Sequence, residues 1–528
     1  MSARPPRPAH TRMRALAVAL CLTVLATGCA TTATRDVAID GAAIDDAGGF
    51  ALGGQDGQDG GAVNDAGDPG AAGVDDGTQP FDPGSAGDAG SLGGSAGGSG
   101  GGSGGRSASA GGNRAKPAPD GLKMGRGVTA SEIRIGFEVS EGLNEVLGAM
   151  GYNTGGDVPN EAQIVGALVN WLNKRGGIRG RKVVPILHPT NPTSGNFATQ
   201  AQAACSTFTE DNHVFAAGSA PAAGSEILAA CMAEKRTPFL AHNYWPFGTE
   251  HFRKWAGYFY QPGRAGGERH WAASIDALAG AGFFKGAKVG LVSFDAPQFR
   301  HLTDDVVKPR LARHGIKPAA EAAVSTIYQA SDVSKVSAES NSIILRFRAA
   351  GVTHVMFVEY QGTIPFFFLP QAESQNYRPA YGLVSSNNPS TVAKQSPAAQ
   401  LEHVMGVGWN PGGDTLRQNY HPNATAALCE QAMKEGGYAV NYAAAGFYIY
   451  PQCDTLLFVK AALERAPELT TAGLQAGIAA LGDSYLSPQG MLTRFGPGRA
   501  DGSDAYRLFR FDAACACFAY TGPVRRFP

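Results

Sequence analysis

Beyond its first 28 residues, the sequence contains no run of about 18 apolar residues, the length that a membrane-spanning helix needs. It also lacks the ligand spacings of common zinc sites, such as C-x-x-C and H-E-x-x-H. Residues 113–528 contain no G-x-S-x-G, the turn that presents the nucleophilic serine of α/β-hydrolases. We therefore expect no membrane-spanning helix in this part of the chain, no metal site, no cofactor and no enzymatic activity.

Large apolar residues are scarce between residues 30 and 112, which consist mainly of Gly, Ala, Asp and Ser. Such a segment cannot bury enough apolar surface to offset the entropy lost on ordering. We expect residues 29–126 to form a disordered tether, in which residues 30–112 have a typical end-to-end distance of about 50 Å. It would act as a spacer, or let the rest of the chain search near a membrane partner.

Clusters of basic residues with interleaved aromatics are also missing. The formal net charge of −1 combines +4 in residues 1–28, −10 in residues 29–112 and +5 in the remainder. A mildly basic body on an acidic tether lacks the charged stripe of a nucleic-acid interface. We expect no nucleic-acid partner.

The first 28 residues are arranged like an export signal. Four arginines precede the apolar run from Ala15 to Ala26, which is too short to span a bilayer stably. Small residues then lead into Cys29. This arrangement resembles a bacterial lipoprotein signal, although Ala26 stands where Leu is usual. The resemblance implies lipidation of Cys29 and anchoring on the outer face of the cytoplasmic membrane; the alternative is an ordinary secretory signal with an incidental cysteine.

The stretch from Asn173 to Val183 predicts a helix end, a tight turn and a strand start. Apolar residues three or four positions apart predict a helix with one buried face over residues 160–173. Asn160 followed by Gln163 predicts a capping box at its beginning. The glycine pair at 176–177 supplies the left-handed backbone that commonly ends a helix.

Two predicted strands flank this helix, Ile133–Val139 before it and Val183–Leu187 after it. A strand, helix and strand in this order call for a parallel sheet. In this setting the run N-x-x-G-G-I-x-G-R-x-V at 173–183 resembles the type 1 periplasmic-binding fold. More narrowly, it is similar to the branched-chain amino acid class of ABC-transporter solute-binding proteins, and the likeness continues more weakly from about residue 128 to 518.

The resemblance implies an α/β fold of two Rossmann-like lobes, each a parallel sheet flanked by helices, joined by a three-crossing hinge. We expect residues 127–262 and 385–485 to form lobe 1. Residues 263–384 and 486–528 are expected to form lobe 2 and a closing hairpin.

Candidate binding residues of lobe 1 follow its strands, because ligands of open parallel sheets bind beyond the carboxyl ends of the strands. Ser140 and Glu141 follow the first strand, with a solvated loop as the alternative. Ser219 and Ala220 precede a helix start, where a hydroxyl and free N–H groups suit a carboxylate or another anion, or simply cap the helix. The resemblance places this position in the ligand cleft.

A polar and aromatic group, residues 242–247, follows the next predicted strand, and such a mixture suits a ligand wall. By resemblance it corresponds to the second ligand-contacting loop of this lobe. We select Asn243 and Tyr244, although Tyr244 would equally suit packing on the surface of the lobe.

The candidates of lobe 2 also follow predicted strands. They are Phe294, then Tyr360 and Gln361 in a loop that the resemblance places over the ligand, and finally Ser385 and Asn387. For Tyr360, a packed aromatic is the alternative.

Amino-acid binders of this class usually have an acidic residue near this last position to pair the ammonium group of the ligand. Residues 385–388 contain none. A buried ammonium without a carboxylate is costly, so a standard amino-acid ligand is in doubt unless Glu359 or Asp295 takes the role.

Six cysteines follow Cys29, and an even number in an exported protein argues for disulfides. The resemblance implies a bridge between Cys205 and Cys231. Cys429 and Cys453 would join neighbouring helices. Cys515 and Cys517 remain as a tight pair or as free thiols.

We therefore expect an extracytoplasmic solute-binding lipoprotein of an ABC importer, which captures a small polar solute that is amino-acid-like, an amide or aromatic. Its partners would be the solute, the ABC permease subunits and, through the lipid anchor, the membrane. The alternatives are a ligand-sensing receptor of the same fold with a separate signalling partner and, less favoured, an exported hydrolase.

Overall fold

The computed structural model describes residues 121–142, 159–191, 196–221, 224–329, 332–415, 422–440 and 442–528. The predicted export signal, Cys29 and most of the predicted tether lie outside the described residues. In the described part of the chain, no helix combines the length and the apolar character that crossing a membrane requires.

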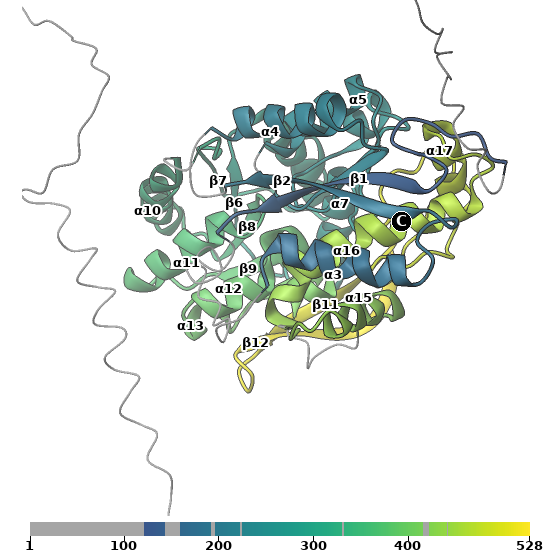
Figure 1. Cartoon of the computed structure of the whole chain (residues 1–528). Coiled ribbons are helices and arrows are strands. Elements are labelled where there is room, and N and C mark those ends of the chain that lie inside the picture. Colours follow the sequence, from purple (N-terminus) through teal and green to yellow (C-terminus); the bar gives the residue numbers. More distant parts are fainter. Residues whose placement is uncertain are drawn as a thin grey trace, which may run out of the picture. The chain divides into compact units, whose positions relative to one another are not determined.

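The first sheet is entirely parallel and has the strand order β2-β1-β3-β4-β5. Its strands are β1 (Glu132–Ser140), β2 (Lys182–Thr190), β3 (Ala216–Ser219), β4 (Phe239–Ala241) and β5 (Phe259–Tyr260). Helices cover both of its faces (Figure 1). The first face carries α3 (Glu161–Lys174), α15 (Ala424–Glu435) and α16 (Tyr442–Arg465), and the opposite face carries α4 (Phe197–Ser206) and α5 (Ser225–Glu234).

Helix α3 confirms the predicted capping box, because Asn160 Oδ1 accepts from the Gln163 N–H while the Gln163 side chain accepts from the Asn160 N–H. Behind the helix, Gly177 adopts a φ of 65°, and a Cβ atom there would lie 1.9 Å from the carbonyl oxygen of Arg181. The turn that leads from α3 into β2 therefore requires glycine.

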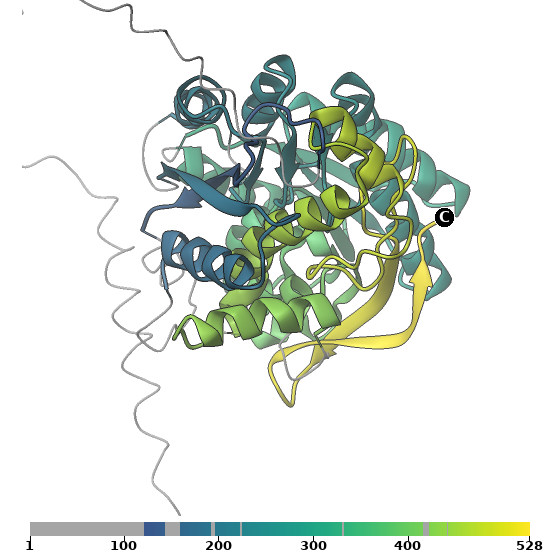
Figure 2. The same ribbon diagram turned by 45° about the vertical axis from the view of Figure 1, so that its right-hand side comes forward.

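The second sheet has the order β12-β11-β10-β9-β8-β6-β7. Its parallel strands are β6 (Val289–Phe294), β7 (Ala320–Val324), β8 (His354–Val358), β9 (Ala380–Val384) and β10 (Met405–Gly408). The antiparallel hairpin of β11 (Ala505–Asp512) and β12 (Cys517–Arg526) completes one edge (Figure 2).

The remaining helices connect or cover these strands. They are η1 (Thr207–Asp211), α6 (Thr249–Lys254), α7 (Gly267–Gly280), α8 (Pro297–His301), η2 (Leu302–Val307), α9 (Lys308–Arg313), α10 (Val333–Ala349), α11 (Thr363–Ser374), η4 (Ser385–Asn387), α12 (Pro389–Gln395), α13 (Ala398–Leu401), α14 (Pro411–Asp414) and α17 (Thr471–Ala479).

One predicted lobe boundary needs correction. The prediction returned the chain to lobe 1 at residue 385, but β10 pairs in parallel with β9 and therefore extends the second sheet. Helices α15 and α16, which follow, pack on α3 of the first sheet. The chain thus stays in lobe 2 about 25 residues longer than predicted, because Met405–Gly408 forms one more parallel strand before the return.

Disulfides link neighbouring helices as predicted. Cys205–Cys231 joins α4 to α5, and Cys429–Cys453 joins α15 to α16. Cys515 and Cys517 are bonded to each other at the turn of the β11–β12 hairpin.

Candidate ligand-binding site between the two sheets

The loops at the carboxyl ends of the two sheets meet in an aromatic contact. Trp245, which follows β4, packs against Phe299 of α8 and Tyr360, which follows β8, with ring centroids 5.7 and 5.1 Å apart. Phe294 at the end of β6 lies 5.4 Å from Tyr360. All four rings are buried. The structure thus brings together the predicted residues Phe294 and Tyr360, with Trp245 as their partner from the other lobe.

Tyr244 lies apart from this aromatic contact, in a polar cluster where the chain crosses between the sheets. Its ring lies under the Arg264 guanidinium, 4.0 Å from the centroid, and its hydroxyl contacts Asn410. Arg264 Nε also donates to the carbonyl oxygen of His242 at 2.9 Å. Arg264 belongs to the first crossing, after β5, and Asn410 to the second, after β10, so Tyr244 touches both.

Two buried aspartates, Asp414 and Asp454, lie near Arg264. Burial raises the pKa of Asp414 to about 7 and that of Asp454 to about 6, although the positive charge of Arg264 lowers both pKa values in part. Asp454 accepts from the Ser487 and Tyr485 hydroxyls at 2.6 and 2.5 Å. Burial also lowers the pKa of His242 to about 3, so this imidazole is neutral at pH 7.

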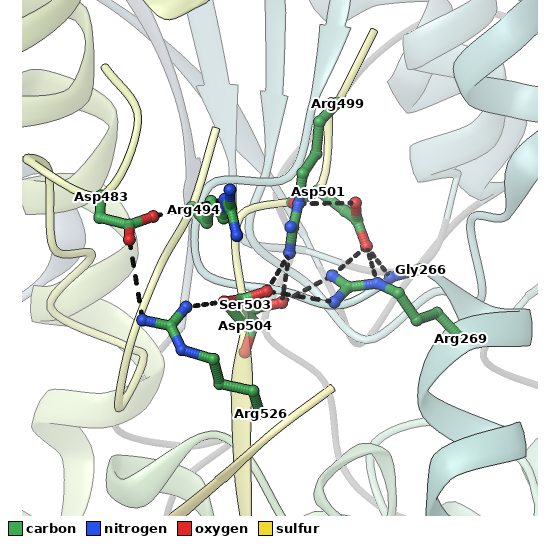
Figure 3. Close-up of polar contacts among 9 residues, drawn as sticks. All are labelled: Gly266, Arg269, Asp483, Arg494, Arg499, Asp501, Ser503, Asp504 and Arg526. Carbon is green, nitrogen blue, oxygen red and sulfur yellow. Dashed lines mark hydrogen bonds and ion pairs between the residues drawn. The ribbon is translucent and has the colours of Figure 1, made fainter. Parts of the chain in front are cut away.

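A second charged network ties the first crossing to the third, which lies between α17 and β11. Gln261 and Asp501 form a parallel bridge, with the Gln261 N–H donating to the Ala500 carbonyl at 2.8 Å. Asp501 accepts from the Gly266 N–H and from Arg269 Nε at 2.7 and 2.9 Å (Figure 3). These contacts join the first and third crossings by hydrogen bonds.

Ser140 and Ser219 lie beside two buried glutamates at the carboxyl end of β1. The hydroxyls of Thr190 (2.7 Å) and Ser219 donate to the two carboxylate oxygens of Glu138. The Ser140 N–H donates to Glu161 at 2.6 Å, and the Gln452 amide donates to the Glu138 carbonyl at 3.0 Å. Ser219 was predicted to help bind an anion, but its hydroxyl donates to the Glu138 carboxylate. Its surroundings therefore offer hydrogen-bond acceptors, whereas an anion needs donors.

Three other predicted residues of the site point elsewhere or hold the loop. Glu141 is exposed and Ala220 is partly exposed. The Asn243 amide donates to the Pro221 carbonyl and to Ser225 Oγ, both at 2.8 Å, and so fixes its own loop. The structure does not bring these residues together with Tyr360.

The predicted polar residues of lobe 2 are engaged within that lobe. Ser385 donates to Asp414 at 2.9 Å and accepts from the Trp409 N–H. Asn387 donates to the Phe357 carbonyl at 3.0 Å and accepts from the Val384 N–H. Gln361 occupies a turn with a φ of 63° before α11.

The two acidic residues considered as ammonium partners in lobe 2 are also occupied. Glu359 accepts from the N–H groups of Thr363 and Gly362 at 2.9 and 3.3 Å and caps α11. Asp295 accepts from the N–H and the hydroxyl of Thr326, both at 2.8 Å. Both oxygens of Glu359 thus accept from N–H groups, whereas the contacts of Asp295 involve Oδ1 only.

The sequence predictions missed the buried charged residues Glu138, Glu161, Arg264, Asp414 and Asp454. For two of them a signal was present. Glu138 interrupts the apolar strand I-G-F-E-V, and Asp454 interrupts the apolar helix segment Y-P-Q-C-D-T-L-L-F. A charged residue at a position that the pattern buries is informative, because burial is costly without a partner. Among the residues that the structure describes, no group of three or more His, Cys, Asp or Glu could hold a metal ion.

No protein-family model matches the chain, and no match was found among curated proteins. Solved structures do match. A branched chain amino acid ABC transporter from Thermus thermophilus with bound valine has a TM-score of 0.56 and 14% identity, over 75% of this chain and 96% of that one. An ABC transporter substrate-binding protein from Desulfitobacterium hafniense in complex with Leu has a TM-score of 0.51 and 15% identity, over 74% and 100%.

A fatty acid ABC transporter substrate-binding protein from Thermomonospora curvata has a TM-score of 0.53 and 16% identity, over 77% and 94%. The three structures thus carry chemically different solutes or solute classes in their names. The strand order of both sheets and the three crossings agree with this likeness. The chain has the type 1 periplasmic-binding fold.

Proposed function

We propose that this protein is an extracytoplasmic solute-binding protein of an ABC importer, which captures a small polar solute between its two lobes. One observation carries the proposal: the loops at the carboxyl ends of the parallel strands of both sheets meet in an aromatic contact, and three crossings join the sheets. The names of the similar structures, which describe substrate-binding proteins of ABC transporters, support it.

In this proposal the protein acts by binding alone. A solute that contacts both lobes favours the arrangement in which they meet, through its higher affinity for that state. The permease would then recognise the closed form. No covalent bond is made or broken.

The screen that tests this proposal measures thermal unfolding of the purified protein with amino acids, amides, amines, short peptides, fatty acids and aromatic acids. A true ligand raises the stability by about 2.7 kcal/mol at a hundredfold excess over its dissociation constant. Small-angle scattering then measures whether the hit makes the protein more compact. A hit that leaves the scattering curve unchanged contradicts capture by closure.

The position of the site is tested with Tyr360→Ala. Loss of the ring removes the contact with Trp245 across the two lobes, and we expect weaker binding of the solute that the screen identifies. Unchanged affinity would remove Tyr360 from the site.

Anchoring through Cys29 is a separate part of the proposal. It rests on the arrangement of residues 1–29. Metabolic labelling with a clickable fatty acid should mark the wild-type protein and not Cys29→Ser. Absence of label from the wild-type protein would point to an ordinary secretory signal, and equal labelling of both would place the fatty acid on another residue.

A further inference from the structure

The carboxyls of Glu138 and Glu161 form a buried pair built from two elements. Glu138 comes from the end of β1, and Glu161 is the first residue of α3. Their relative exposures are 3% and 0%. Both oxygens of Glu138 accept from hydroxyls, whereas Glu161 accepts the Ser140 N–H at Oε2 only. Among the described residues, no hydrogen-bond donor reaches Glu161 Oε1.

Neither carboxyl has a cationic partner within the described part of the chain: no Lys, Arg or His forms an ion pair with Glu138 or Glu161 there. Burial raises the pKa of Glu161 to about 8, and the charge of Glu138 adds to this rise. Gln452 and the Ser140 N–H oppose it in part. Two adjacent buried carboxyls do not ionise together without a cation, so the pair holds a proton at neutral pH.

The pair lies at the carboxyl end of β1, an internal strand of the first sheet, and ligands of open parallel sheets bind at this end of the strands. Its neighbours add acceptors. The hydroxyls of Ser219 and Thr190 give their protons to Glu138 and keep only lone pairs for a ligand. A solute carboxylate would meet carboxylates and lone pairs here, whereas a group with several N–H donors would be fully satisfied.

We propose that Glu138 and Glu161 bind the ammonium group of an amine-bearing solute. This inference rests on the function proposed above and names the class of its solute. The three N–H donors of a primary ammonium supply the donor that Glu161 Oε1 lacks and the charge that the pair lacks. The ammonium is thus held by lobe 1, and the missing acidic residue at 385–388 of lobe 2 is no obstacle to an amine ligand.

Isothermal titration with 1,4-diaminobutane, agmatine, lysine and phenethylamine tests the inference, with succinate, propionamide and octanoate as amine-free probes. The best amine should bind wild-type protein, and Glu161→Gln should weaken it by about tenfold to a hundredfold, as expected for a lost charge-assisted hydrogen bond. Glu359→Gln is the matched control. It changes a carboxyl that is also buried and that caps the start of α11, and the variant should bind the amine as wild-type protein does.

A second readout needs no variant. Titration of wild-type protein at pH 7 in two buffers of different ionisation enthalpy counts the protons released to the buffer. Amine binding should release up to one proton, because the ammonium displaces it. Among the described residues, the groups that face Glu161 are Glu138, which titrates, and Gln452, which does not; His188, beside Glu138 in the register, contacts Thr207.

Four outcomes overturn the inference. Binding of an amine without proton release and with equal affinity in Glu161→Gln places the ammonium elsewhere. Binding of succinate, propionamide or octanoate alone leaves the solute-binding function standing and excludes the amine. A response to Na⁺ or Ca²⁺ alone assigns the pair to a metal ion. Silence of all four amines in a folded protein excludes the amine, whereas the solute-binding function fails only if the wider thermal screen is also silent.

Discussion

Two buried glutamates, one in each lobe, have similar surroundings and different partners. Burial raises the pKa of both Glu161 and Glu359 to about 8; Glu161 is the first residue of α3, and the side chain of Glu359 caps the start of α11. Glu359 accepts from Asn387 and from the N–H groups of Thr363 and Gly362. Within the described part of the chain, Glu161 accepts the Ser140 N–H at Oε2, has no hydrogen-bond donor at Oε1, and faces a second carboxyl. Burial alone does not distinguish a structural carboxyl from one that binds a ligand; the supply of donors does.

The largest effect should follow from removing a buried charge whose partners are all in place. Arg264→Met strips the guanidinium from the His242 carbonyl, the Tyr244 ring and the two aspartates nearby. We expect the free energy of unfolding to fall by about 3–5 kcal/mol, because uncompensated charges remain buried. Chemical denaturation measures this change.

The control for that variant is Arg494→Met, an arginine of the third crossing whose side chain is 58% exposed. Its ion pair with Asp483 is at the surface and should contribute less than about 1 kcal/mol. Equal effects of the two substitutions would show that the polar cluster around Arg264 does not hold the crossings together.

The second effect concerns the carboxyl that is well supplied with donors. In Glu359→Gln an amide NH₂ group replaces one carboxylate oxygen and faces a hydrogen-bond donor that it cannot satisfy. We therefore expect the free energy of unfolding to fall by about 1–3 kcal/mol. Thermal and denaturant unfolding both report it. A stable variant would mean that Glu359 is not the cap of α11.

The third effect is a dependence of stability on pH. Glu161 has a higher pKa when folded than its ordinary value of 4.5, so the native state binds the extra proton. Its contribution to stability is therefore complete below about pH 4.5 and is lost as the pH rises through about 8. The slope from one such proton is at most about 1.4 kcal/mol per pH unit. Unfolding measured between pH 5 and 8.5 should show this fall.

Asp414, Asp454 and Glu359 also have raised pKa values and act in the same direction. Glu161→Gln should therefore reduce the slope without abolishing it. An identical slope in the variant would show that Glu161 is ionised throughout this range.

The smallest effect should come from Glu161→Gln at pH 7 without ligand. The amide supplies a donor beside Glu138 and removes one of two adjacent carboxyls, so stability should stay within about 1 kcal/mol of the wild type or rise. Denaturation at pH 7 measures it. A loss of stability as large as that of Glu359→Gln would show that the fold depends equally on both carboxyls.

Much of the fold was predictable from the sequence because its signals are local. The capping box at Asn160, the glycine turn at 176–177 and the strands predicted at residues 133–139 and 183–187 depend on neighbours in the chain. The lobe boundary failed because β10 has only four residues, and its membership depends on pairing with β9 rather than on its own composition.

The candidate site was less predictable, because partners decide its chemistry. Ser219 lies at the end of β3, close to its predicted position, but its role depends on Glu138, 81 residues away. The role of Arg264 depends on Tyr244, Asn410 and the two aspartates around it, which come from other crossings and helices. No pattern within a short window of sequence states these pairings.

Trp245 is placed so that its fluorescence can report on the separation of the two lobes. Its indole is 7% exposed and lies between the two lobes, against Phe299 and Tyr360, with its N–H on Glu226 at 3.1 Å. Separation of the lobes would expose this ring to solvent and shift its fluorescence emission to longer wavelength. Opening and closing can then be followed in real time on unlabelled protein, and Trp245→Phe would identify the signal among the five tryptophans.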